Sequence, residues 1–212
     1  MDVGGRPLLA WSLAAFRASD AVAMVVVAAP PGHEHTVERI AGELAGAPGE
    51  PGAFHPVVIT GGDSRIASVG HALAEVPASA ELVAGHDAAR PLVSPRLIAA
   101  LFERLAGEPA AAGAIAATPL TDTVKRATDD GLEVALTEPR AGLWAAQTPQ
   151  VFRAPILREV HDTMSSETAT DDAMLVEAVG GRVLIEPAPP ENLKVTTDAD
   201  RRLAELLLAD RG

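Results

Sequence analysis

Residues 81–118, ELVAGHDAARPLVSPRLIAALFERLAGEPAAAGAIAAT, contain the strand, helix and strand that indicate the fold class. Leu82–Ala84 and Gly113–Thr118 are short apolar segments of strand length. The pair Ser94-Pro95 between them is typical of an N-cap and first helical turn. This order of elements predicts an α/β protein whose largely parallel sheet is covered by helices.

The same alternation continues on both sides of this unit and predicts one domain over residues 1–212, with helices on both faces of the sheet. A glycine- and proline-rich connection runs from residue 46 to residue 56. The remaining expected elements are, in chain order, helix Pro7–Ala18, strand Val22–Ala29, helix Glu34–Leu44, strand Val57–Thr60, helix Ile66–Val76, helices Pro155–Thr163 and Asp171–Val179, and strand Arg182–Glu186.

Residues 119–152 break the alternation, because they carry no helical period and are too long for an ordinary loop. Short β-prone pieces around Asp130-Gly131 favour a projecting, hairpin-like β-arm. The chain then closes with a helix that begins at a capping box formed by Thr197 and Asp200. Three leucines of this helix are expected to face the core: Leu203, Leu206 and Leu207.

The composition excludes several classes of function. Of 212 residues, 48% are hydrophobic and 22% are charged, which is typical of a globular protein. No apolar run approaches the ~18 residues of a membrane span and no secretory signal is evident, so we expect no membrane contact. The chain has no cysteine, which is compatible with the cytoplasm. Its formal net charge of -12 argues against a nucleic-acid surface.

Only two of the 17 basic residues are lysines, Lys125 and Lys194. An ammonium group is a compact point charge suited to phosphate, so each lysine is a candidate anion contact. Lys194 stands just before the last predicted helix, where its charge could meet a phosphate. Retention of two surface lysines by chance is an equally good explanation at this point.

The segment Gly85-His86-Asp87-Ala88-Ala89-Arg90-Pro91 stands where a strand ends and a helix is about to begin. In open α/β sheets this carboxyl edge is where ligands bind. An aspartate here can hold Mg²⁺ between nucleotide phosphates, and the small alanines after it let a ribose approach. A turn aspartate that caps the next helix is the alternative, and Arg90 beside it makes the two interpretations about equal.

A second candidate is the glycine turn Gly61-Gly62-Asp63-Ser64-Arg65, with Ser68 three residues further on. Backbone N–H groups at such a helix start suit an anion or a base edge. The turn alone is a weak signal, because it lacks the glycine spacing of the Rossmann and P-loop motifs. Elsewhere, Thr170-Asp171-Asp172 is most simply a helix N-cap with favourable first-turn charge.

The order of the segments is more specific than any one of them. It comprises G-G-D-S-R-x-x-S from Gly61, H-D-A-A-R-P from His86, T-D-T-V-K-R from Thr121, R-x-G-L-W-x-x-Q-T-P-Q-x-F from Arg140, T-D-D-A from Thr170 and N-L-K-V-T-x-x-x-D from Asn192. This succession closely resembles the 2-C-methyl-D-erythritol 4-phosphate cytidylyltransferases over essentially the whole chain. The resemblance implies a three-layer αβα Rossmann-like nucleotidyltransferase fold, with a mostly parallel sheet and a projecting β-arm.

The resemblance also implies a reaction in non-mevalonate isoprenoid biosynthesis. Methylerythritol 4-phosphate attacks the α-phosphorus of CTP and gives 4-diphosphocytidyl-2-C-methyl-D-erythritol and pyrophosphate. Such a displacement rests on positioning and on charge stabilisation by Mg²⁺ and cationic side chains, without a protein nucleophile. Carried over by motif, Asp87 would be the metal ligand, and Asp87, Lys194 and Arg140 would be catalytic. The nucleotide would contact Gly62, Asp63, Arg65, Ser68 and Ala88, and the acceptor would contact Arg90, Thr123, Arg140, Thr148, Thr170 and Lys194.

The arm implies a homodimer in which Arg140 and Thr123 of one chain reach the site of the other. One departure from the family concerns the beginning of the chain. The family starts with a strand and a glycine-rich loop that grips the triphosphate, and Met1–Pro7 aligns just after that loop, where Arg6 is no substitute by motif.

Because every later motif is intact, we expect a longer natural chain, and we expect an open backbone edge in the sheet as given. A catalytically inactive dimerising homologue is one alternative. Another polyol- or sugar-phosphate nucleotidyltransferase is the other, and base preference would separate it.

Overall fold

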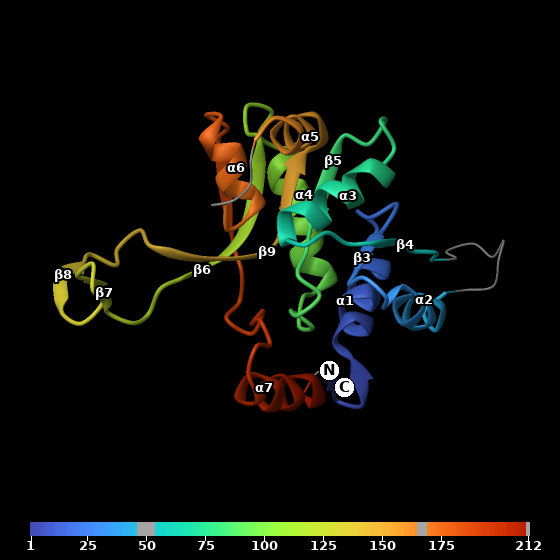
Figure 1. Cartoon of the computed structure of the whole chain (residues 1–212), viewed down its shortest axis with the longest axis horizontal. Helices are drawn as coiled ribbons and strands as arrows, with labels where there is room; N and C mark the ends of the chain where they lie inside the picture. The colour runs from blue at the N-terminus through green and yellow to red at the C-terminus, as the bar shows by residue number, and fades with distance from the viewer. Residues whose placement is uncertain (46–53, 165–168, 211–212) are drawn as a thin grey trace.

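The computed structural model describes residues 1–45, 54–164 and 169–210 (Figure 1). Short strands and helices alternate and gather into one body, from which a single hairpin projects. The glycine- and proline-rich connection predicted from residue 46 to residue 56 falls largely outside these ranges. None of the helices within them is long and apolar enough to cross a membrane.

The larger sheet has four strands in the order β10-β6-β9-β5. β10 (Val183–Pro187) pairs with β6 (Gly113–Pro119) in parallel, while β5 (Leu82–Gly85) and β6 both pair with β9 (Trp144–Arg153) antiparallel. β5, β6 and β10 therefore share one direction, and β9 is reversed. The prediction of a mostly parallel sheet is confirmed.

A smaller parallel sheet contains β3 (Val26–Ala29) and β4 (Val57–Thr60). β3 is shorter than the strand predicted from residue 22, and it pairs only with β4 among the described residues. β5 likewise pairs only with β9 there, so each of these strands has an open backbone edge, as predicted for this sheet. At the start of the chain, β1 (Asp2–Val3) and β2 (Arg6–Pro7) form a separate antiparallel hairpin.

The helices follow the predicted alternation, with boundaries that differ by a few residues. The Ser94 side chain accepts a hydrogen bond from the Leu97 N–H, and Thr197 and Asp200 form the predicted capping box. The helices in the described ranges are α1 (Leu8–Arg17), α2 (Glu34–Gly42), α3 (Arg65–Glu75), α4 (Pro95–Ala106), α5 (Ala154–Thr163), α6 (Asp172–Ala178) and α7 (Asp198–Ala209).

The four-stranded sheet is covered on both faces because its strand residues alternate between two cores. Ile115 and Phe152 point to one face, where they pack with α3, α5 and α6. Their neighbours Ala114 and Val151 point to the other face and pack with α4. Gly113 lies opposite Phe152, and a Cβ at Gly113 would lie 2.5 Å from the Phe152 ring, so this position requires glycine. The three-layer αβα arrangement is confirmed.

The projecting arm is narrower than the predicted range of 119–152. Its tip is the antiparallel pair β7 (Val124–Ala127) and β8 (Val134–Glu138), which Figure 1 shows standing away from the body. Residues 144–153 form β9, whose second half is buried in the central sheet. The segment that closes the predicted arm is therefore a core strand, because it pairs with β5 and β6 together.

The prediction for the last helix was wrong for two of its three leucines. Leu203 and Leu206 are 47% and 67% exposed. α7 instead packs through Ala204 and Leu207, and Val3 and Val195 belong to the same cluster. These inward positions keep helical spacing, but the contact with the N-terminal hairpin rotates the buried face away from the predicted one.

Candidate active site

Asp87 is the second residue after β5, at the carboxyl end of that strand. Its loop lies against the segment that precedes α7, because the Val195 N–H donates to the Ala89 carbonyl at 2.8 Å. Arg90, only 9% exposed, donates from Nη1 to the Asn192 carbonyl, also at 2.8 Å. Two segments about a hundred residues apart in sequence therefore form one surface at the edge of the sheet.

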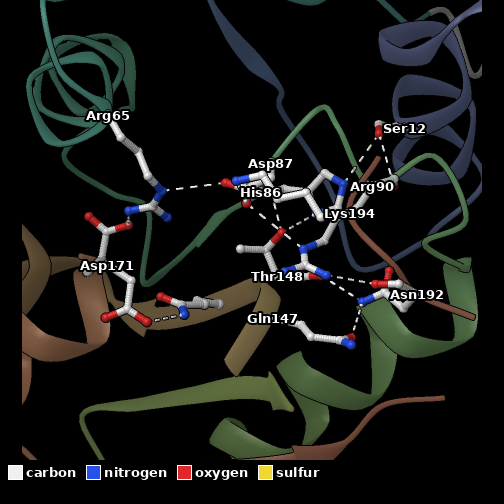
Figure 2. A network of polar contacts seen from close by, with 12 residues as sticks. Ser12, Arg65, His86, Asp87, Arg90, Gln147, Thr148, Asp171, Asn192 and Lys194 are labelled. Atoms are coloured by element: carbon white, nitrogen blue, oxygen red, sulfur yellow. Dashed lines mark hydrogen bonds and ion pairs between the residues drawn. The ribbon is translucent and has the colours of Figure 1, made fainter. Parts of the chain in front are cut away.

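Three cationic side chains surround the Asp87 carboxylate, as Figure 2 shows. Lys194 Nζ lies 3.0 Å from Oδ2, Arg65 Nε lies 3.5 Å from Oδ1, and the Arg90 Nε lies 3.9 Å from Oδ2. Burial raises the pKa of Asp87, but the hydrogen bond and charge of Lys194 and the two arginines outweigh it, so the pKa is below its usual value. Asp87 is therefore an anionic carboxylate surrounded by cationic side chains.

A chain of hydrogen bonds supports the Asp87 loop from beneath. The Asp87 N–H donates to Thr148 Oγ1 at 3.0 Å, and that hydroxyl lies 3.1 Å from His86 Nδ1. On the other side of the ring, His86 Nε2 lies 3.3 Å from the Ser12 hydroxyl, which donates to the Arg90 carbonyl. One proton on Nε2 and none on Nδ1 satisfies every step, so the geometry calls for a neutral imidazole.

The environment of His86 supports that protonation state. Its ring packs against Phe16, with centroids 5.1 Å apart. Burial lowers the pKa of His86 to about 4, although the Asp87 charge acts in the opposite direction. The imidazole is therefore uncharged at neutral pH and serves as a fixed acceptor and donor under the loop.

The glycine turn lies between β4 and α3, and its geometry explains why it needs glycine. A Cβ on Gly62 would lie 2.4 Å from the Ala67 Cβ, so only glycine allows this close approach. The Ser68 hydroxyl accepts a hydrogen bond from the Gly62 N–H at 3.0 Å, and Ser64 caps α3 by accepting from the Ala67 N–H. Asp63 stands exposed at the tip of the turn.

Arg65 joins this turn to a buried acid on α6. Its Nη1 lies 2.8 Å from Asp172 Oδ2, an ion pair without the alignment of a hydrogen bond. The other Asp172 oxygen lies 2.9 Å from His161 Nε2. Burial raises the pKa of Asp172, but its contacts with His161 and Arg65 outweigh this effect. The pKa of Asp172 is therefore below its usual value, and this buried group is also a carboxylate.

The structure brings together one part of the predicted site and separates another. Asp87, Lys194, Arg65 and Arg90 form the cluster described above. Gly62, Asp63 and Ser68 belong to the turn that opens α3, and Ala88 is exposed on the Asp87 loop. Thr123 and Arg140 lie on the arm, where the Arg140 guanidinium contacts the Thr121 carbonyl, away from this cluster. Thr170 is exposed just before α6.

Two residues predicted to contact the acceptor form hydrogen bonds with other residues of this chain. Thr148 is 4% exposed and its hydroxyl is held by His86 and the Asp87 backbone. Arg90 is buried against the Asn192 carbonyl. Both therefore position the Asp87 and Lys194 segments, and a direct acceptor contact at either remains only a prediction.

Several residues of this network were missed from the sequence. Asn192 is fully buried and donates to Gln147 Oε1 and to the Thr148 carbonyl. Asp171 is the α6 N-cap as predicted, but Asp172 beside it turns inward to His161. The charge pattern gave no reason to distinguish the two aspartates, because their difference depends on packing around α5.

The residues present fit a magnesium ion in one specific way. No group of three or more His, Cys, Asp or Glu side chains in the described ranges could hold a metal. Asp87 is a single carboxylate whose oxygens are ion-paired to cations. Mg²⁺ is commonly held by one or two carboxylates together with substrate phosphates and water. Asp87 would therefore be the residue to hold such a metal, with substrate phosphates supplying further oxygens.

The fold and this site together define a class of protein. A mostly parallel α/β sheet carries an aspartate, a lysine and two arginines at its carboxyl edge, beside a glycine turn that opens a helix. This is the arrangement of an α/β nucleotidyltransferase. Residues 1–210 match the family model of 2-C-methyl-D-erythritol 4-phosphate cytidylyltransferase, and the chain belongs to that family.

Individual relatives agree with this assignment. The chain is 43% identical to the 2-C-methyl-D-erythritol 4-phosphate cytidylyltransferase of Frankia casuarinae, over 98% of this chain and 72% of the relative. It is 38% identical to the enzyme of the same name from Prochlorococcus marinus, over 100% and 89%. The crystal structure of the enzyme of that name from Thermus thermophilus superposes with a TM-score of 0.75 at 35% identity, covering 98% of this chain and 91% of that one.

Proposed function

We propose that this chain is a cytoplasmic cytidylyltransferase that converts CTP and methylerythritol 4-phosphate to 4-diphosphocytidyl-2-C-methyl-D-erythritol and pyrophosphate. The main support is the Asp87 carboxylate with Lys194, Arg65 and Arg90 around it, beside the Gly61-Gly62 turn. Family membership over residues 1–210 supports the same substrates. One nucleotidyltransferase domain per chain is part of this proposal.

In this proposal the cytosine lies against the turn that opens α3. Hydrogen-bond donors and acceptors lie within a few residues of each other in this turn, on the Gly62 backbone, Asp63 and the Ser68 hydroxyl. This combination suits the edge of a base. Ala88 is exposed and small, so a ribose can approach the Asp87 loop there. These contacts would place the α-phosphate of CTP near Asp87 and Lys194.

The chemical step is a displacement at the α-phosphorus. A phosphate oxygen of methylerythritol 4-phosphate forms the new P–O bond, and the bond to pyrophosphate breaks. Lys194 stabilises the charge between the two phosphates, and Asp87 is the residue that would hold Mg²⁺ beside them. Bound Mg²⁺ would neutralise charge on the triphosphate.

We further propose a homodimer in which the arm completes the partner's site. The arm carries large apolar side chains in an exposed position: Leu132, Val134 and Leu136 are 85%, 62% and 45% exposed. Such a surface is typical of a contact with another chain. Thr123 and Arg140 lie on the same arm, away from the Asp87 cluster of their own chain. In the dimer, Thr123 and Arg140 would contact a substrate phosphate bound in the site of the neighbouring subunit.

We expect CTP to be strongly preferred over the other nucleotides. In a pyrophosphate-release assay with methylerythritol 4-phosphate and Mg²⁺, kcat/KM for CTP should exceed that for UTP by at least about 100-fold, because a site that hydrogen-bonds a base edge rejects the wrong edge strongly. Equal use of UTP would indicate another polyol- or sugar-phosphate nucleotidyltransferase. No turnover with any nucleotide would favour the inactive dimerising homologue.

Co-expression of two inactive variants tests the shared site. Asp87→Asn and Arg140→Ala chains should each be nearly inactive, but mixed dimers carry one intact site if the arm is exchanged. Random pairing should therefore restore about a quarter of the wild-type rate, since half of the dimers have one working site out of two. Asp87→Asn with Lys194→Ala is the matched control and should restore nothing, because those two residues belong to one chain's cluster. Failure of the first pair to complement would refute arm exchange.

A further inference from the structure

A buried acid outside the predicted site is connected to it by one arginine. Asp172 is the first residue of α6, and its side chain is 1% exposed. One oxygen lies 2.9 Å from His161 Nε2 on α5, and the other lies 2.8 Å from Arg65 Nη1 on α3. His161 is itself 5% exposed, so Asp172 is the centre of a group of polar contacts that joins three helices.

Arg65 is the only described cation that faces both Asp172 and Asp87. Its Nε lies 3.5 Å from Asp87 Oδ1. Gly85 lies beside this contact, because a Cβ there would be at van der Waals distance, 3.4 Å from Asp172 Oδ2 and 4.0 Å from Arg65 Nη2. The guanidinium therefore lies between the end of β5 and the start of α6.

Arg65 stands at the boundary between the glycine turn and α3. It is the first residue of α3, immediately after the Ser64 N-cap. Gly62 and Ser68 lie on either side of it and share a hydrogen bond. Any movement of the Arg65 backbone would move the whole glycine turn relative to Asp87.

A buried carboxylate without its partners is costly, so the pairing strongly favours one arrangement of the arginine. The Asp87 contact alone is longer and more exposed than the Asp172 contact, with 18% exposure at Asp87 against 1% at Asp172. The closer and more buried restraint on Arg65 thus comes from Asp172, while the Asp87 contact is the one aligned as a hydrogen bond. His161 adds a second contact that holds the carboxylate in place.

We propose that Asp172, held by His161, is a positioning residue of the nucleotide site that acts through Arg65. It fixes the start of α3, and with it the cytosine turn, at a set distance from Asp87. The inference rests on the proposed function for its substrate, CTP, but the restraint itself is a property of the folded chain.

The test combines a double-mutant cycle with a stability control. The variants are Asp172→Asn, Arg65→Gln, the double variant, and Arg158→Gln. Arg158 is the matched control, because it also ties α5 to α3, through the Leu73 and Val76 carbonyls at the far end of α3 from the turn. KM and kcat for CTP are measured for each variant, together with hydrogen exchange of a peptide covering residues 61–68.

We expect Asp172→Asn to raise KM for CTP about tenfold with kcat changed less than about threefold, because the turn binds the base equally in the ground and transition states. In the Arg65→Gln background the same change should add less than about twofold, since the two residues act through one contact. Exchange at residues 61–68 should speed up in Asp172→Asn and stay at the wild-type rate in Arg158→Gln.

Additive effects of the two substitutions would overturn the proposal. Unchanged KM and exchange in Asp172→Asn, with only a lowered melting temperature as in Arg158→Gln, would also overturn it. If the wild-type chain turns over no nucleotide, the proposed function fails, and the exchange measurement alone decides on the positioning role. His161→Gln gives a second route to the same measurement if Asp172→Asn does not fold.

Discussion

Asp87→Asn should abolish Mg²⁺-dependent turnover while the chain stays folded. The substitution keeps the size of the side chain and removes the charge that three cations surround. An amide oxygen is a much weaker ligand for Mg²⁺ than a carboxylate, and the loss of one electrostatic contributor typically lowers the rate by about 10²–10³-fold. Initial rates of pyrophosphate release across a Mg²⁺ series, with circular dichroism for the fold, measure both parts.

The fold should survive because the loop has other supports. The Asp87 backbone N–H still donates to Thr148, and Arg90 still donates to the Asn192 carbonyl. Asp198→Asn is the matched control, since Asp198 is 68% exposed and ion-paired on α7 with Arg201 and Arg202. That variant should keep the wild-type rate. Retained activity in Asp87→Asn would refute the assignment of the metal ligand.

Lys194→Ala should lower kcat/KM by about 10²–10³-fold, which corresponds to ~2.7–4 kcal/mol of transition-state stabilisation for one charge-stabilising donor. Lys194 Nζ is 3.0 Å from Asp87, and its side chain is 46% exposed, so the ammonium can turn from the carboxylate to an incoming phosphate. Lys125→Ala removes the only other lysine, which lies on the arm and bonds to Thr137, and should leave the rate within about twofold.

The pH profile of Lys194→Ala is a second, independent test of the role of Lys194. Burial raises the pKa of Asp87, and Lys194 supplies the largest of the contributions that lower it. Removing the ammonium raises that pKa, so a larger fraction of Asp87 is protonated at mildly acidic pH. The acidic limb of the residual rate should therefore move to higher pH. If neither the acidic limb of the pH profile nor the rate changed, the role assigned to Lys194 would be refuted.

Local sequence signals predicted the elements because their causes are local. Ser94 and Thr197 cap helices through their own neighbours three residues on, and the apolar strand Val57–Thr60 appears with the predicted bounds. The candidate residues Asp87 and Lys194 could also be named in advance, because each stands between a β-strand or loop and a helix. Their spacing along the chain says nothing about distance, yet the structure places them 3.0 Å apart.

Features that depend on long-range packing were not predictable in this way. Residues 144–153 share the β-prone composition of the arm, and only pairing with β5 and β6 makes them a core strand. Leu203 and Leu206 have the helical spacing of a buried face, but the partner of α7 lies on another side of the helix. In both cases the deciding neighbour is distant in sequence.

Residue type and short spacing were enough to establish the alternation of strands and helices, the caps, and the family to which the ordered motifs belong. Which charges meet could be learned only from the folded chain. Arg65 lies between Asp87 and Asp172, and His86 lies neutral under the Asp87 loop. A charge acts over a few ångströms and a pKa responds to burial, so both depend on chain segments that folding alone brings together.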